Sequence, residues 1–344
     1  MADGPTGTQR IERLDALRAV AMFLVVGIHA HSYAGLDAEA SDTWLRFAVS
    51  AAGVPIFFLV DGFLFASRRA SERFDHARYL AASARRLLVP WLIFSAIYLV
   101  ARAAAESWQL VHERVVLGKS PLGVAACAYF SCAALQMYFL LSLFAIRCLA
   151  PLWHRLARAP AWASLAAFAA ATWLLRGLVL DAYEARFGAR TDPLLLALWG
   201  LQFHLFGATL ARHAAWLRRQ RSPLLALAAV LVIAGRSGPI SSPFVAQYAY
   251  LAALFLLFFG LEDVGRLLPR IGRETMGIYL LHTPVLMSAV TRLASPRVAD
   301  PHALFAVVTV LSFAIALALA LAIGRVPRGA ILFGRLERRG AEGF

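Results

Sequence analysis

The chain has 344 residues, of which 60% are apolar and 16% are charged, and its mean hydropathy is +0.67. An ordinary soluble protein has about 45–50% apolar and about 25% charged residues, so the composition excludes that class. The formal net charge is +14. Because the arginines flank apolar runs instead of forming one basic stripe, we expect no nucleic-acid partner.

Ten apolar stretches follow one another along the chain, each long enough, or nearly so, to cross a bilayer as a helix of about 20 residues. They cover residues 15–33, 45–67, 86–105, 134–153, 160–180, 193–211, 222–236, 244–261, 271–291 and 303–324. We therefore predict an all-α integral membrane protein of about ten transmembrane helices, in which residues 1–344 form a single domain.

The basic residues between these stretches predict the side that each loop faces. With the N-terminus in the cytoplasm, the expected inner segments hold more than twice as many arginines and lysines as the outer ones. The positive-inside rule expects such an excess for ten spans with both termini in the cytoplasm. No small-residue cleavage site follows the first apolar run, so we interpret it as an uncleaved first helix.

The first stretch carries two ionisable residues, Arg18 and His29, eleven positions apart. Eleven residues return a helix to nearly the same face and advance it by about 16 Å. One face therefore presents a guanidinium near the cytoplasmic surface and an imidazole about half a bilayer deeper. An ionisable group inside a spanning helix is costly, and it marks a functional site by default. His31 lies nearer the outer interface, and we expect it at the surface.

The two side chains suit complementary chemistry. Histidine accepts a proton from a hydroxyl near neutral pH, and arginine binds phosphate oxygens bidentately. They fit a cytoplasmic, phosphate-bearing donor whose reactive end reaches into the membrane. The sequence has no nucleophile elbow, phosphate-binding glycine loop or zinc-protease motif. Cys127, Cys132 and Cys148 lack metal-ligand spacing, so we expect no metal and interpret them as buried small hydrophobes.

Other polar residues within the apolar stretches are candidates to face a common interior. They are Asp61, Gln136, Arg147, Gln202, His204, Tyr279 and His282. Tyr279 and His282 are three residues apart and share a helix face, and Pro284 is expected to bend that helix. A packing role and a site role both fit this pair. As candidate substrate-binding residues we take Tyr279, His282 and Gln136.

The segment "IERLDALRAVAMFLVVGIHA" resembles the first helix of the membrane-bound acyltransferase-3 family, which acylates surface glycans and related molecules. Four later segments resemble further helices of that family in the same order: "VPIFFLVDGFLFA", "RRLLVPWLIFSAIY", "MYFLLSLFAIRCLAPL" and "IGRETMGIYLLHTPVL". The resemblance covers nearly the whole chain and is loose between residues 155 and 265.

This resemblance implies an O-acyltransferase of the bacterial inner membrane that takes an acyl group, usually acetyl, from cytoplasmic acyl-CoA. The acceptor would be a hydroxyl of a surface polysaccharide or a lipid-linked sugar, and polysaccharide-assembly proteins are candidate partners. His29 matches the family's essential histidine, as general base or as part of an acyl relay. Arg18 matches its partner arginine, which would contact the donor phosphate or the carbonyl region.

Two positions depart from the family pattern. Asp61 stands where the family usually has a serine, and its carboxylate could orient His29 as a catalytic residue or pair with a buried arginine. The third-helix entry often has two arginines three residues apart, whereas this chain has adjacent Arg85 and Arg86. We take both as candidate contacts for the CoA phosphates. The alternative interpretation is that they are ordinary basic residues at the cytoplasmic end of a membrane span.

A secondary transporter or flippase of a glycan-assembly pathway is the competing hypothesis. Buried arginine, histidine and aspartate side chains would then line the substrate path. Many transporters contain repeated halves with paired broken helices, and no such internal symmetry is visible in this sequence. A non-catalytic scaffold would leave His29 without a role.

Overall fold

The computed structural model describes residues 11–36, 43–69, 74–175, 192–237 and 242–334, and every secondary-structure element in these ranges is helical. The first half contains α1 (Glu12–Tyr33), α2 (Thr43–Ser50), α3 (Gly53–Arg69), α4 (His76–Ser107), α5 (Pro121–Tyr129), η2 (Leu135–Met137), α6 (Tyr138–Cys148), α7 (Ala150–Arg158) and α8 (Ala161–Leu174). The second half contains α10 (Pro193–Arg212), α11 (Ala214–Arg219), α12 (Arg221–Ser237), α13 (Pro243–Phe259), α14 (Leu267–Arg273), α15 (Thr275–Leu281), η4 (His282–Leu286), α16 (Met287–Ala294), α17 (Pro301–Arg325) and η5 (Gly329–Phe333). The all-α class agrees with the sequence prediction.

The number of spans is smaller by the criterion of length and apolarity. Five helices of the described residues are long and apolar enough to cross a membrane: Glu12–Tyr33, Trp44–Arg68, His76–Ser107, Pro193–Arg212 and Pro301–Arg325. A sixth is added if α6 and α7, bent by 56°, count as one span. The ten-span count is therefore not confirmed.

The predicted spans that fail this test are short or broken. Helices α8 and α13 are apolar but have fewer than 18 residues, and the predicted span 271–291 is divided among α14, α15, η4 and α16. The end of the predicted fifth span, residues 176–180, lies outside the described residues, as do both chain termini, for which a cytoplasmic location stays a prediction.

A repeated local signal starts several helices. Ser120, Asp192, Ser242 and Asp300 each accept a hydrogen bond from a backbone N–H of the first turn, and each is followed by proline at the first helical position. The side-chain oxygen satisfies an N–H that has no partner inside the helix, and proline contributes no such N–H. This combination places the starts of α5, α10, α13 and α17.

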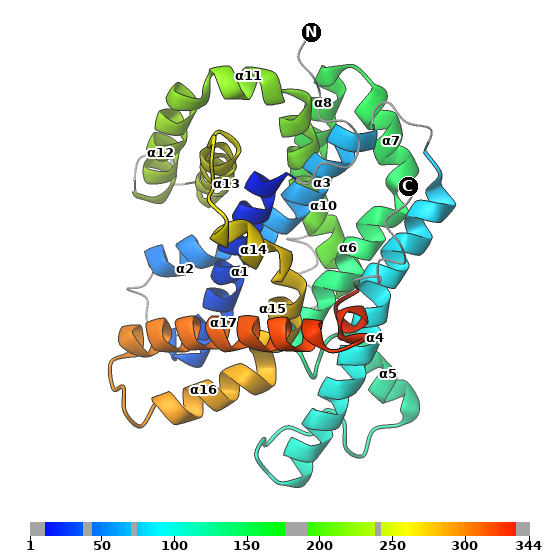
Figure 1. Ribbon diagram of the computed structural model, residues 1–344, viewed down its shortest axis with the longest axis vertical. Coiled ribbons are helices and arrows are strands. Elements are labelled where there is room, and N and C mark those ends of the chain that lie inside the picture. Colours follow the sequence, from blue (N-terminus) through cyan, green and yellow to red (C-terminus); the bar gives the residue numbers. More distant parts are fainter. Residues whose placement is uncertain (1–10, 37–42, 70–73, 176–191, 238–241, 335–344) are drawn as a thin grey trace.

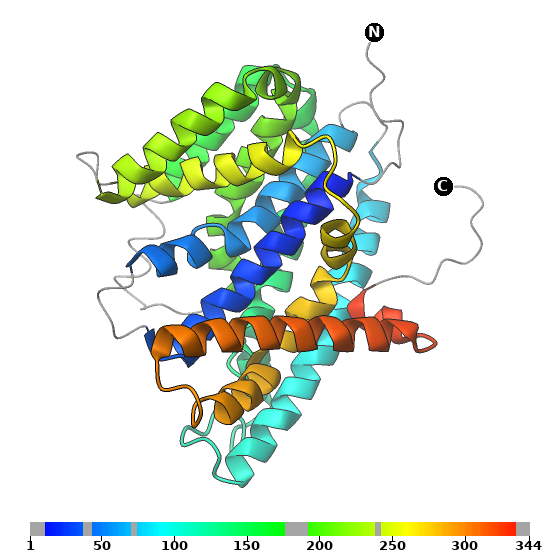
Figure 2. The same cartoon turned by 60° about the vertical axis from the view of Figure 1, so that its left-hand side comes forward.

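Helix α1 lies in the centre of the molecule and packs against α3, α14 and α17, while α4 runs along one edge (Figure 1). Helix α17 crosses α1 (Figure 2). Phe23 of α1 contacts Phe313 of α17 edge to face. Helices α3 and α10 form the most extensive pair. A Cβ at Gly62 would collide with the backbone carbonyl of His204, and one at Gly207 with that of Leu59. The absence of side chains at these two glycines allows the close approach.

Candidate active site

Arg18 and His29 lie on one uninterrupted helix, α1, as the sequence predicts. Arg18 is near its N-terminal end, where a guanidinium nitrogen is 3.6 Å from the carboxylate of Asp15. The Arg18 side chain retains 25% of its exposure, whereas that of Asp15 retains 6%. Asp15 is therefore an ion-pair partner of Arg18 that leaves part of the Arg18 side chain exposed.

His29 meets a second histidine from the other end of the chain. Its half-buried ring lies with its centroid 5.2 Å from that of His282, and the two planes are tilted by 53°. Among the described residues, neither ring nitrogen of His29 has a hydrogen-bond partner. The contact brings the C-terminal part of α1 to the helix break that follows α15.

The break follows His282 directly. Thr283 has an extended backbone, with φ −144° and ψ 158°, and regular helix resumes at Met287. Pro284 explains the position, because it lacks an N–H and disfavours helical geometry in the residue before it. The bend expected from Pro284 is thus confirmed.

Side chains from other helices satisfy the carbonyls at this break. The Tyr98 hydroxyl of α4 donates to the Leu280 carbonyl, and Gln136 Nε2 donates to the Thr283 carbonyl at 2.5 Å. The Tyr33 hydroxyl at the end of α1 is 3.5 Å from the Pro284 carbonyl. An unsatisfied carbonyl in the bilayer core costs several kcal/mol, so these contacts make the break tolerable. Neither Tyr33 nor Tyr98 is among the site residues predicted from the sequence, although a tyrosine in an apolar stretch is a usable signal.

The hydrogen bonds also identify the acceptor atoms that remain on two buried side chains. His282 is fully buried, and its Nδ1 lies 2.8 Å from the Tyr279 carbonyl and 3.1 Å from the Ile278 carbonyl. Both oxygens are acceptors, so Nδ1 carries the proton and Nε2 carries a lone pair. Likewise Gln136 donates through Nε2, which makes Oε1 an acceptor. His282 Nε2 and Gln136 Oε1 are both buried without a partner among the described residues.

Tyr279 completes this cluster by joining η2 to α15. Its hydroxyl donates to the backbone carbonyl of Gln136, and its ring lies beside those of Phe139 and His282. The structure thus brings together His29, His282, Gln136 and Tyr279, which are far apart in the sequence. Because the Tyr279 hydroxyl donates to the backbone carbonyl of Gln136, Tyr279 helps to fix the position of Gln136.

The comparisons with known proteins identify the family of this chain. A family model described as an acyltransferase domain, Acyl_transf_3, matches residues 11–321. The chain belongs to the acyltransferase-3 family. No curated protein and no solved structure matches it. Family membership and the apolar helices identify a membrane acyltransferase, and the matched range contains all of the cluster around His29.

In this acyltransferase, Asp61 lies in a separate polar cluster. Arg147 of α6 donates to Asp61 Oδ1 through Nη2 at 2.5 Å and through Nε at 3.2 Å. Nδ1 of His204 lies 3.4 Å from the other carboxylate oxygen. Within the described residues, the hydrogen bonds and ion pairs of Asp61 are made with Arg147 and His204, and none is made with His29. The geometry corresponds to pairing with a buried arginine and gives a catalytic role for Asp61 no support.

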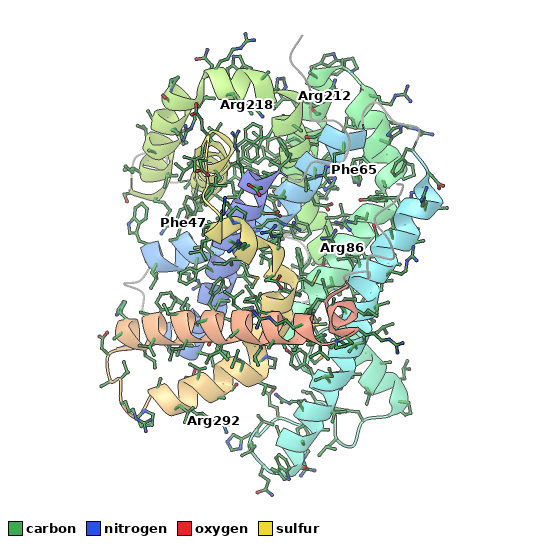
Figure 3. The ribbon with its side chains drawn as sticks, in the orientation of Figure 1. Phe47, Phe65, Arg86, Arg212, Arg218 and Arg292 are labelled. Atoms are coloured by element: carbon green, nitrogen blue, oxygen red, sulfur yellow. The ribbon has the colours of Figure 1, made fainter. Side chains whose placement is uncertain are left out.

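Arg85 and Arg86 are both exposed, and they lie in the N-terminal half of α4. Figure 3 labels Arg86 on this helix. The backbone carbonyl of Arg86 lies against Gly334, just after η5. The contact of Arg85 and Arg86 with CoA phosphates stays a prediction.

Two smaller expectations are wrong. His31 is only 3% exposed, because it packs edge to face against Phe305 of α17, which crosses α1 at this level. Among the three cysteines, Cys127 is buried as expected, but Cys132 and Cys148 are exposed. Apolar neighbours in the sequence did not show which face of a segment is covered by a distant helix.

Proposed function

We propose that the protein is an integral membrane O-acyltransferase of the bacterial inner membrane. It moves a short acyl group, acetyl in the simplest case, from cytoplasmic acyl-CoA to a hydroxyl of a surface polysaccharide or lipid-linked glycan. The observation that carries the proposal is the contact of His29 with His282 at the broken helix, in a chain of the acyltransferase-3 family.

His29 acts as the general base. Its unpartnered nitrogen takes the proton of the acceptor hydroxyl while the hydroxyl oxygen attacks the thioester carbonyl carbon. The carbon–sulfur bond then breaks, and the CoA thiolate leaves with the proton that His29 has taken. The products are the acyl ester of the acceptor and free CoA. A positioned base of this kind contributes about 10²–10⁴-fold to the rate.

Arg18 holds the donor. It shares a helix face with His29 at a separation of about 16 Å along the axis, and its guanidinium retains exposure beside Asp15. Guanidinium binds phosphate in a planar, bidentate geometry and stays charged at any physiological pH. Arg85 and Arg86 serve as further contacts for the CoA phosphates.

His282 and Gln136 hold the acceptor. Each presents a buried lone pair, and a buried acceptor without a partner costs about 1–3 kcal/mol until a donor arrives. Hydroxyl groups supply such donors without adding charge. A sugar carries several, so that one can react at His29 while others donate to His282 Nε2 or Gln136 Oε1. Tyr279 positions Gln136 for this task.

A pair of histidine variants on the same helix tests the proposal. His29→Ala removes the base, whereas His31→Ala removes an equally large ring that packs against Phe305. Membranes containing equal amounts of each protein are supplied with acetyl-CoA labelled in the acetyl group, and base-labile label on surface glycan is measured. We expect a loss of about 10²–10⁴-fold for His29→Ala and near-normal transfer for His31→Ala.

Two results would contradict the proposal. Equal transfer by His29→Ala and the wild type would remove the catalytic role of His29. If wild-type membranes move no label from CoA to any acceptor, while the glycan is exported less efficiently without the protein, the transporter hypothesis replaces the enzyme.

A further inference from the structure

A second basic site lies at the N-terminal end of α1, away from Arg18. It is a cavity of about 390 Å³ lined by residues of α1, α11, the start of α12 and the end of α13. Its charged lining consists of Arg13, Arg218, Arg219, Arg221 and one carboxylate, Glu262. Four guanidinium groups against one carboxylate give the cavity a strong positive charge.

Two of the arginines are fixed in place by the end of α13. Arg13 donates to the carbonyls of Phe259 and Glu262, both at 3.3 Å, and Arg221 donates to those of Gly260 and Leu257 at 3.1 and 3.3 Å. These carbonyls lie in the last turn of α13 or just beyond it, where helix carbonyls have no partner within the helix and cations are favoured. Capping explains why Arg13 and Arg221 are there, but it uses only part of their donors.

Arg218 and Arg219, the other two arginines of the lining, do not cap the helix. The Arg218 guanidinium lies 4.6 Å from the centre of the Phe259 ring, and Arg219 is exposed. Neither has a hydrogen-bond acceptor in the part of the chain that the structure describes. The Nε of Arg221 is also buried there without a partner. The cavity lining thus keeps several guanidinium donors available to an anion.

We propose that this cavity binds the phosphate group of an anionic phospholipid from the cytoplasmic leaflet. Basic pockets between membrane helices on the cytoplasmic side are suited to such headgroups, and arginine matches phosphate oxygens bidentately. Trp216, on the same short helix α11 as Arg218, is 53% exposed. An exposed tryptophan beside arginines is typical of the membrane–water interface. Figure 3 places Arg218 at the opposite end of the molecule from Arg292 of α16, which belongs to an expected outer segment.

The face of α1 argues for a lipid instead of the acyl donor. Arg13 precedes His29 by 16 positions, which turns the helix by about 160°, whereas Arg18 and His29 differ by about 20°. A CoA held in this cavity would therefore have its phosphates on the far side of α1 from the histidine. A phospholipid has no such constraint, since its chains remain in the surrounding leaflet.

The test measures lipid binding by the whole protein. Wild type and Arg218→Ala/Arg219→Ala are purified, and retention of phosphatidylglycerol against phosphatidylcholine is measured by native mass spectrometry over a lipid titration. This double variant leaves both capping arginines intact. Arg155→Ala/Arg158→Ala, which removes two basic residues from α7, is the matched control. Since each basic residue near an anionic surface contributes about 1 kcal/mol, we expect roughly thirtyfold weaker phosphatidylglycerol binding for the double variant alone.

Arg218→Lys/Arg219→Lys should recover part of the binding, because lysine keeps the charge without the planar fork. Equal retention by wild type and Arg218→Ala/Arg219→Ala would overturn the proposal, and so would an equal loss in the control. Displacement of the bound lipid by adenosine 3′,5′-bisphosphate would show that the nucleotide end of the donor occupies the cavity, which also overturns it. None of these outcomes depends on the proposed acyl transfer.

Discussion

The contact between Asp61 and Arg147 provides a test that separates structural support from catalysis. Both side chains are largely buried, at 12% and 15% exposure, and their closest nitrogen–oxygen distance is 2.5 Å. Asp61→Ala would leave the Arg147 guanidinium in the bundle without its counter-ion. Asp61→Ala/Arg147→Leu would remove both charges and fill part of the space with apolar atoms.

The expected magnitudes differ sharply between these two variants. Removing one partner of a buried ion pair costs about 3–5 kcal/mol, because the remaining charge is not compensated. Replacing both partners by apolar residues is often neutral, because the desolvation of two charges is also removed. We therefore expect Asp61→Ala to be strongly destabilised, and Asp61→Ala/Arg147→Leu to recover most of the wild-type stability. His204, 3.4 Å from the carboxylate, is present in every variant.

Two measurements on each purified variant decide the matter: the thermal midpoint of unfolding in detergent, and acetyl transfer at a temperature where all variants are folded. If Asp61 only supports the fold, the double variant regains both stability and transfer. A double variant that is as stable as the wild type but loses transfer about 10²-fold or more would refute this reasoning. Asp61 would then act in the reaction, which is the catalytic one of the two roles that the sequence left open.

Three further variants test single contacts. His282→Phe keeps a ring beside His29 but removes the acceptor nitrogen. We expect kcat/KM for the acceptor to fall about tenfold while KM for acyl-CoA is unchanged. An equal effect on both substrates would contradict this. Gly62→Ala forces a methyl group against the His204 carbonyl and should lower the free energy of unfolding by about 1–3 kcal/mol, measured as a lower thermal midpoint. Gly324→Ala is the control, because a Cβ at Gly324 meets no other atom within 4 Å. Glu106 is buried and accepts hydrogen bonds from three loop N–H groups and Arg102, so Glu106→Gln should accelerate proteolysis of residues 108–120; unchanged cleavage would argue against this role.

Local signals in the sequence predicted the helices well. Each apolar stretch is mostly helical within the described residues, and the Ser/Asp-Pro pairs mark where four helices begin. The spacing of Arg18 and His29 likewise needed nothing beyond helix periodicity. The span count was less predictable, because apolarity does not show whether a stretch forms one straight helix or a bent pair such as α6 and α7.

Partners across the bundle could not be predicted in the same way. The sequence placed Asp61 among the buried polar residues but left two readings, and only the packing of α3 on α6 and α10 brings it to Arg147 and His204. His31 was misjudged for the same reason, since α17 covers it from more than 250 positions away in the chain. Long-range packing determines burial, and a single sequence contains no direct record of it.

The broken helix shows why the active-site cluster forms where it does. Pro284 alone predicts a bend, but a bend within a membrane persists only if neighbouring groups satisfy the released carbonyls. Here Tyr98 and Gln136, from two other segments, donate to them. Satisfying the backbone in this way uses the amide nitrogen of Gln136 and the Nδ1 proton of His282, and it leaves one acceptor atom without a partner on each side chain. The break that the fold must stabilise therefore also creates the hydrogen-bond acceptors available to a hydroxyl beside His29.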